Sequence, residues 1–162
     1  MTDTKSLKVE AKGDLEIVIT RDFNAPAGHV FDAWTKPELI TKWLGVRGGW
    51  TFAVCEVDLK VGGAYRFVWR SSEGTEMGMG GIYREIDRPA RLVSTERFDD
   101  PWYPGESVNT LELTERAGTT IVVATMKYES REVRDGVLAS PMATGIAESY
   151  DKLAEILAKR AA

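Results

Sequence analysis

Residues 141–159 form the pattern that most constrains how this chain can fold. Their apolar side chains, from Met142 to Leu157, recur every three to four residues and therefore share one face of an α-helix, while charged side chains occupy the opposite face. Ser140 and Pro141 supply a capping hydroxyl and a proline suited to a first helical turn. The predicted helix spans roughly 28 Å at about 1.5 Å per residue, and its apolar face must be buried against a large partner.

The residues before this helix predict an antiparallel sheet as that partner. Short segments alternate apolar and polar side chains, and turns rich in glycine, aspartate or proline separate them, which is typical of successive strands. Short links between strands favour antiparallel pairing. A sheet of about six strands spaced about 4.8 Å apart is as wide as the predicted helix is long. We predict strands at residues 15–23, 51–58, 64–70, 77–86, 91–98, 107–115 and 119–128, and short helices at residues 27–34 and 35–44.

Together these elements indicate an α+β fold. In it, one long C-terminal helix lies over a curved antiparallel sheet of about six to seven strands, and two short helices accompany it. The 162 residues suit one domain, which we place at residues 13–162. Residues 1–12 are polar, and we expect them to form a flexible lead-in before the first strand.

The charge and the cysteine content limit the partners and the chemistry that we expect. The net charge is -4 and lysine and arginine do not cluster, so a nucleic-acid partner is not expected. No segment approaches the roughly 18 apolar residues of a membrane span. Cys55 is the only cysteine, which excludes an internal disulfide and fits a cytoplasmic location, and we interpret it as a buried structural thiol. His29, the only histidine, has no partners at metal or triad spacing, so we assign it to the surface or a helix cap and expect neither a metal nor a cofactor.

Bulky side chains on one face of the strands point to a space between the sheet and the helix. Phe67 and Trp69 share a face, and glycines at positions 78, 80 and 81 predict a bend or bulge within a strand. A strongly bent sheet under a single helix can leave room between the two layers. The alternative is an ordinary core, because aromatic and methionine stripes are typical of buried packing as well.

Motifs along most of the chain resemble one protein family. In chain order they are Pro26-x-x-x-Val30-Phe31-x-Ala33-Trp34-Thr35-x-Pro37-Glu38, Trp43, Val57-Asp58-Leu59-x-Val61-Gly62-Gly63-Ala64-Tyr65-Arg66, Gly81-x-Tyr83-x-Glu85-Ile86, Arg91-Leu92-Val93 with Thr95-Glu96, and Gly145-x-x-x-Ser149-Tyr150-x-x-Leu153. From about residue 15 to residue 157 the chain resembles the AHSA1-like (activator of Hsp90 ATPase homologue-like) branch of the SRPBCC, or START/Bet v 1-like, superfamily. The resemblance implies a helix-grip fold with a deep cavity between sheet and long helix. Members of the wider superfamily bind lipids, sterols, polyketides and hormones, and some catalyse cyclisation or ring oxidation.

We therefore expect the chain to bind a small hydrophobic or aromatic molecule in that cavity, without catalysis. A cyclase- or hydrolase-like enzyme that uses Glu96 with Tyr83 or Asn109 is one alternative. A co-chaperone-like module that binds a chaperone, or a second copy of the chain, through its outer surface is another. The predicted ligand-binding residues are Phe67, Trp69, Met79, Glu96, Trp102, Tyr103, Asn109, Met126, Met142, Ile146 and Tyr150.

Two features of this prediction depend on where side chains point. If Glu85 or Glu96 faces inward, burial would raise its pKa and make it a candidate acid, base or hydrogen-bond acceptor. The alternative is a rim carboxylate paired with an arginine. Trp102 and Tyr103 stand between two prolines in a loop, where they would either cover the cavity mouth or pack on the edge of the sheet.

Overall fold

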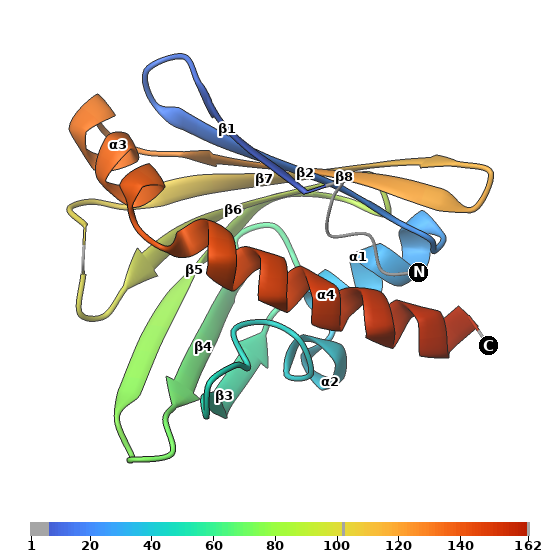
Figure 1. The fold of residues 1–162 in the computed structure, drawn as a ribbon, viewed down its shortest axis with the longest axis horizontal. Helices are drawn as coiled ribbons and strands as arrows, with labels where there is room; N and C mark the ends of the chain where they lie inside the picture. The colour runs from blue at the N-terminus through green and yellow to red at the C-terminus, as the bar shows by residue number, and fades with distance from the viewer. Residues whose placement is uncertain (1–6, 102, 162) are drawn as a thin grey trace.

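The computed structural model describes residues 7–101 and 103–161, which form one antiparallel sheet of eight strands and four helices (Figure 1). The strands are β1 (Lys8–Lys12), β2 (Glu16–Phe23), β3 (Thr51–Val57), β4 (Ala64–Arg70), β5 (Glu76–Asp87), β6 (Arg91–Phe98), β7 (Ser107–Arg116) and β8 (Thr119–Lys127). The helices are α1 (Ala27–Thr35), α2 (Pro37–Ile40), α3 (Arg131–Ala139) and α4 (Met142–Ala161).

The sheet has the strand order β1-β2-β8-β7-β6-β5-β4-β3. Strands β3 to β8 form a meander, and β2 joins it by pairing with β8, from Glu16 opposite Lys127 to Phe23 opposite Thr120. Figure 1 shows β3, β4 and β5 turning away from the other strands, so that the sheet curls around α4. A register shift between Tyr83 and Glu85 accompanies this bend.

A glycine permits the close approach of two strands at the bend. A Cβ atom at Gly81 in β5 would overlap the carbonyl oxygen of Thr95 in β6, so a larger residue would force the backbones apart. The glycine run in this strand therefore allows a close backbone contact rather than forming a loop.

Helix α4 lies along the concave side of the sheet (Figure 1). Leu153 and Leu157 in its C-terminal half are fully buried, and Arg160 donates a hydrogen bond to Asp32 of α1 at 2.9 Å. The buried Arg21 of β2 forms an ion pair with Asp151 of α4 at 2.9 Å. These contacts fasten the C-terminal half of α4 to α1 and the sheet. Within residues 7–101 and 103–161, no helix has both the length and the apolar character to span a membrane.

The predicted fold class is confirmed, and the structure adds two elements to it. Residues 8–12 were expected to belong to the flexible lead-in, but they form β1, which pairs with β2 from Lys8 opposite Thr20 to Lys12 opposite Glu16. Its residues alternate between polar and apolar, but only Val9 and Ala11 are apolar and most of the strand is exposed, so the segment resembles the polar residues before it. The other residues of the expected lead-in, 1–6, lie outside the described residues.

The second additional element, α3, was not predicted because its hydrophobic pattern is short. Ser130 caps it by accepting a hydrogen bond from the backbone N–H of Val133 at 3.2 Å. Val133, Val137 and Leu138 fall at helical spacing and pack on the core, but of the three only Val137 is fully buried. A pattern this short is a weaker periodic signal than that of α4.

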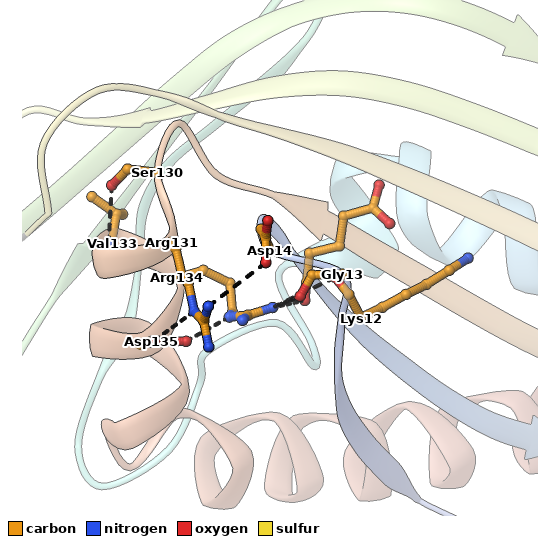
Figure 2. A network of polar contacts seen from close by, with 9 residues as sticks. Lys12, Gly13, Asp14, Ser130, Arg131, Val133, Arg134 and Asp135 are labelled. Carbon is orange, nitrogen blue, oxygen red and sulfur yellow. Dashed lines mark hydrogen bonds and ion pairs between the residues drawn. The ribbon is translucent and has the colours of Figure 1, made fainter.

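Arg134 anchors α3 to the turn between β1 and β2 (Figure 2). Its side chain is only 4% exposed, and Nη1 donates hydrogen bonds to the carbonyl oxygens of Gly13 at 3.1 Å and Glu16 at 2.9 Å. Its Nε donates to Asp135 at 2.8 Å. One buried guanidinium therefore ties α3 to the β-hairpin at the edge of the sheet.

We predict that Arg134→Met lowers the free energy of unfolding by about 1–3 kcal/mol, because it removes charged donors from backbone carbonyls while it keeps an apolar stem of similar length. Urea unfolding would measure the change. Arg131→Met is the matched control, since Arg131 lies on the same helix, is exposed and makes only long ion pairs, of 3.9 and 3.7 Å. We expect the control to shift the same quantity by less than about 0.5 kcal/mol. Equal losses in the two variants would contradict the anchoring role.

Candidate functional site

A cavity of about 350 Å³ lies between the concave face of the sheet and the N-terminal half of α4. Met142, Ile146 and Tyr150 of α4 form one wall, and strands β4 to β8 supply most of the others. Aromatic and aliphatic side chains predominate in the lining. Concave, largely apolar cavities of this size, with a few polar groups, are typical of small-molecule sites.

Most of the predicted ligand-binding residues lie together around this cavity. The sequence-predicted residues that line it are Phe67, Met79, Glu96, Tyr103, Asn109, Met126, Met142, Ile146 and Tyr150. Trp102, also predicted, lies outside the described residues. Strand alternation and helical periodicity were therefore enough to gather these side chains at one place, and their role in binding remains a prediction.

Trp69, also predicted to bind the ligand, does not line the cavity. It shares a face of β4 with Phe67, but the step of two residues, about 6.6 Å along a strand, takes it past the cavity wall. Its Nε1 donates to the carbonyl oxygen of Leu44 at 2.9 Å, and its ring packs against Phe52 at a centroid distance of 4.9 Å. A Cβ atom on Gly45 would lie 2.8 Å from that Nε1, which shows how closely the segment after α2 covers the indole. Trp69 is thus part of the packed core and not of the cavity lining.

The sequence predictions missed several aromatic residues of the lining. Tyr65 lies two residues before Phe67 on the same face of β4, so alternation could have found it. Trp34 comes from α1, and the sequence offers no signal that its ring reaches the cavity. Tyr128, directly after β8, contacts Tyr103 with a ring-centroid distance of 5.4 Å.

Glu96 provides the polar end of the cavity. Its Oε1 accepts a hydrogen bond from the hydroxyl of Tyr103 at 3.2 Å, and its Oε2 accepts one from Nδ2 of Asn109 at 3.1 Å. Ser107 donates to Oδ1 of Asn109 at 3.3 Å, which orients the amide. The pairing of β6 with β7 brings these groups together, because Glu96 lies opposite Ser107 in the ladder. The sheet register thus builds a hydrogen-bond network inside a largely apolar lining.

The surroundings of Glu96 disfavour its charged form. Burial raises the pKa of its carboxyl group, and the hydrogen bonds from Tyr103 and Asn109 counteract part of that effect. Burial also raises the pKa values of Tyr65, Tyr103 and Tyr128, with the charge of Glu96 as the next cause, so these hydroxyls stay neutral at physiological pH. Glu96 is therefore the group of this network that can change its charge.

Glu85, the other candidate carboxylate, faces away from the cavity. Its side chain is 57% exposed and forms an ion pair with Arg91 at 3.1 Å. Tyr83, two residues earlier in β5, lines the cavity, so simple alternation would turn Glu85 inward as well. The register shift between these two residues turns the carboxylate outward instead.

The other reactive side chains lie away from the cavity lining. Cys55, predicted to be a buried thiol, is half-buried, and desolvation raises its pKa to about 11, so it stays protonated. His29 lies in the first turn of α1 and does not line the cavity. Among the residues that the structure describes, no three His, Cys, Asp or Glu side chains are grouped to hold a metal ion.

A second hollow, of about 300 Å³, adjoins the cavity beside α3. Tyr103 and Val137 line both spaces. Pro104, Glu132 and Gly136 complete a rim of loop and helix residues. The Tyr103 side chain therefore stands between the inner cavity and a hollow on the side of α3.

Comparison with known proteins gives a consistent set of relatives. The family model described as activator of Hsp90 ATPase homolog 1-like protein matches residues 24–158. A solved structure from Rhodobacter sphaeroides is 32% identical, with a TM-score of 0.89 over 95% of this chain and 99% of that one. A protein from Mycobacterium smegmatis is 22% identical, with a TM-score of 0.81 over 93% and 95% of the two chains, and therefore shares the fold. An HSP90 activator from Plasmodium falciparum is 24% identical, with a TM-score of 0.55 over 76% and 85%. Comparison with curated proteins gave no match.

We predict that Glu96→Gln stabilises the protein relative to wild type increasingly as pH rises. The folded protein binds the Glu96 proton more tightly than the unfolded chain does. The stability linked to this proton is therefore fully present below the ordinary carboxyl pKa of 4.5 and is lost as pH rises through the raised folded-state pKa. Glutamine stays neutral and avoids that loss. Urea unfolding at a series of pH values would measure the difference.

Glu85→Gln is the control for this series, because its carboxylate is exposed and paired with Arg91. We expect no growing stabilisation in the control over the same pH range. Parallel stability curves for wild type and Glu96→Gln would show that burial does not perturb Glu96.

Proposed function

The chain belongs to the activator of Hsp90 ATPase homolog 1-like family, and we propose that it binds a small hydrophobic or aromatic molecule in the cavity between the sheet and α4. The observation that carries this proposal is the cavity itself, about 350 Å³ in volume, with largely apolar walls and a polar network at Glu96. Such a combination provides affinity through the walls and orientation through the polar groups.

The size of the cavity argues against an ordinary core. Protein interiors are packed as densely as organic crystals, and spaces larger than a water molecule are few. An unfilled space of this volume costs stability, because the side chains around it lose their packing partners. A binding role gives a reason for this cost, because a ligand would restore the missing contacts. Burial of about 200 Å² of apolar ligand surface would contribute about 5 kcal/mol before the cost of ordering is subtracted.

The hollow beside α3 supports an entrance at Tyr103. Because Tyr103 and Val137 line both spaces, a rotation of these side chains would connect the cavity with the hollow. The predicted position of Tyr103 near the mouth fits this geometry. The route would pass between the loop after β6 and α3.

A chaperone interaction is a second candidate function. The description of the family and the Plasmodium falciparum HSP90 activator among the similar structures favour it. Such an interaction would use the outer surface and would not require an open cavity. Filling the cavity therefore separates the two functions, since it would abolish ligand binding and leave a chaperone contact intact.

We predict that the uncharged fluorophore N-phenyl-1-naphthylamine binds the wild-type protein and becomes brighter, and that Ile146→Trp weakens this binding by at least about tenfold. Ile146 lines the cavity from α4, so the larger side chain would occupy the space of the probe. Fluorescence titration measures both affinities.

Ala143→Trp is the matched control, because Ala143 lies one turn earlier on α4 and is exposed. It adds a tryptophan to the same helix without entering the cavity, so we expect wild-type affinity. The proposal fails if the wild-type protein does not bind the probe, or if Ile146→Trp binds it as tightly as Ala143→Trp does.

A further inference from the structure

Glu96 is half-buried in the cavity wall and lacks the cationic partner that a carboxylate in an apolar surrounding usually has. Tyr103 and Asn109 each supply one neutral hydrogen bond, which leaves further acceptor positions on both carboxylate oxygens. Among the described residues, no Lys, Arg or His nitrogen lies within 4.0 Å of this carboxylate. Charged groups are seldom buried in proteins without a partner of opposite charge. A cationic ligand could therefore supply the positive charge that Glu96 lacks.

Aromatic rings line the same cavity, and three of them, Tyr65, Tyr103 and Tyr128, lie close enough to Glu96 for its charge to raise their pKa values. Tyr103 and Tyr128 contact each other edge to face at 5.4 Å, and Tyr65 lies 5.5 Å from Tyr83, measured between ring centroids. All four rings line the cavity. Aromatic faces carry a negative electrostatic potential, which attracts an ammonium group. A carboxylate among such rings disfavours an anionic ligand and favours a cationic one.

We propose that the cavity takes a protonated lipophilic amine, whose ammonium group donates hydrogen bonds to Glu96 while its apolar part lies between the sheet and α4. This inference rests on the proposed binding function and adds the chemical class of the ligand. Charge-assisted hydrogen bonds are about twice as strong as neutral ones, so the ammonium group would gain more from this carboxylate than a hydroxyl of the same size. The ionised form of Glu96 would repel the carboxylate of an acidic ligand.

Three probes with one ring system test the charge preference. They are 1-naphthylmethylamine, 1-naphthalenemethanol and 1-naphthoate, which carry a positive, a neutral and a negative group. Isothermal titration calorimetry at neutral pH would compare their affinities for the wild-type protein. We expect the amine to bind at least about tenfold more tightly than the alcohol, and the naphthoate to bind most weakly.

Variants of the two carboxylates assign the preference to one residue. Glu96→Gln should weaken binding of the amine by at least about tenfold and change binding of the alcohol by less than about threefold, since it removes the charge and keeps the shape. Glu85→Gln, on the outer face, should leave all three affinities unchanged. Unchanged binding of the alcohol also shows that the Glu96→Gln variant is folded and that its cavity is open.

The outcomes separate this inference from the proposed function. If the alcohol binds as tightly as the amine, or if Glu96→Gln weakens both probes alike, the amine preference is wrong and the apolar binding site stands. If none of the three probes and no uncharged fluorophore binds the wild-type protein, the proposed function itself is wrong.

Discussion

One long helix, with α1 and α2 at one end, has to cover the concave face of a strongly bent sheet, and the remaining features of this molecule depend on that constraint. Helix α4 has 20 residues, and an α-helix with its side chains is only about 10 Å wide. Its C-terminal half closes one end of the hollow through Leu153, Leu157 and the contacts with α1. Its N-terminal half faces strands that bend away, and there the cavity remains. Helix α4 is too narrow to fill the concave face of the sheet, and the space that it leaves can hold a ligand.

The chemistry of the cavity follows from the register of the sheet rather than from a contiguous motif. Pairing of β6 with β7 places Glu96 and Asn109 within hydrogen-bond distance, and the loop between these strands adds Tyr103. Tyr65 of β4, Tyr103 of the loop after β6 and Tyr128, which follows β8, line the same cavity. A half-buried acid with neutral donors and no cation is costly in an apolar surrounding, and a ligand of complementary charge would offset that cost. The proposed ligand class therefore follows from the position in which the sheet places Glu96.

The sequence predicted the regular parts of this arrangement and missed those that depend on irregular backbone. The apolar face of α4 and the alternation of Phe67 with its neighbours were enough to place the helix over the sheet and to bring most of the predicted residues to the cavity. The opposite orientations of Tyr83 and Glu85 depend on a register shift, which no pattern of period two can reveal. Arg134 reads as a surface charge in the sequence, yet it is buried because backbone carbonyls of a distant turn accept its hydrogen bonds.

A crystal structure of the protein with 1-naphthylmethylamine tests the central claim most directly. The account predicts electron density for the naphthalene ring between α4 and the sheet, in contact with Met142 and Ile146, and for the amine nitrogen within about 3 Å of the Glu96 carboxylate. A space filled by rearranged side chains, with the probe absent or bound only at the outer surface, would contradict it.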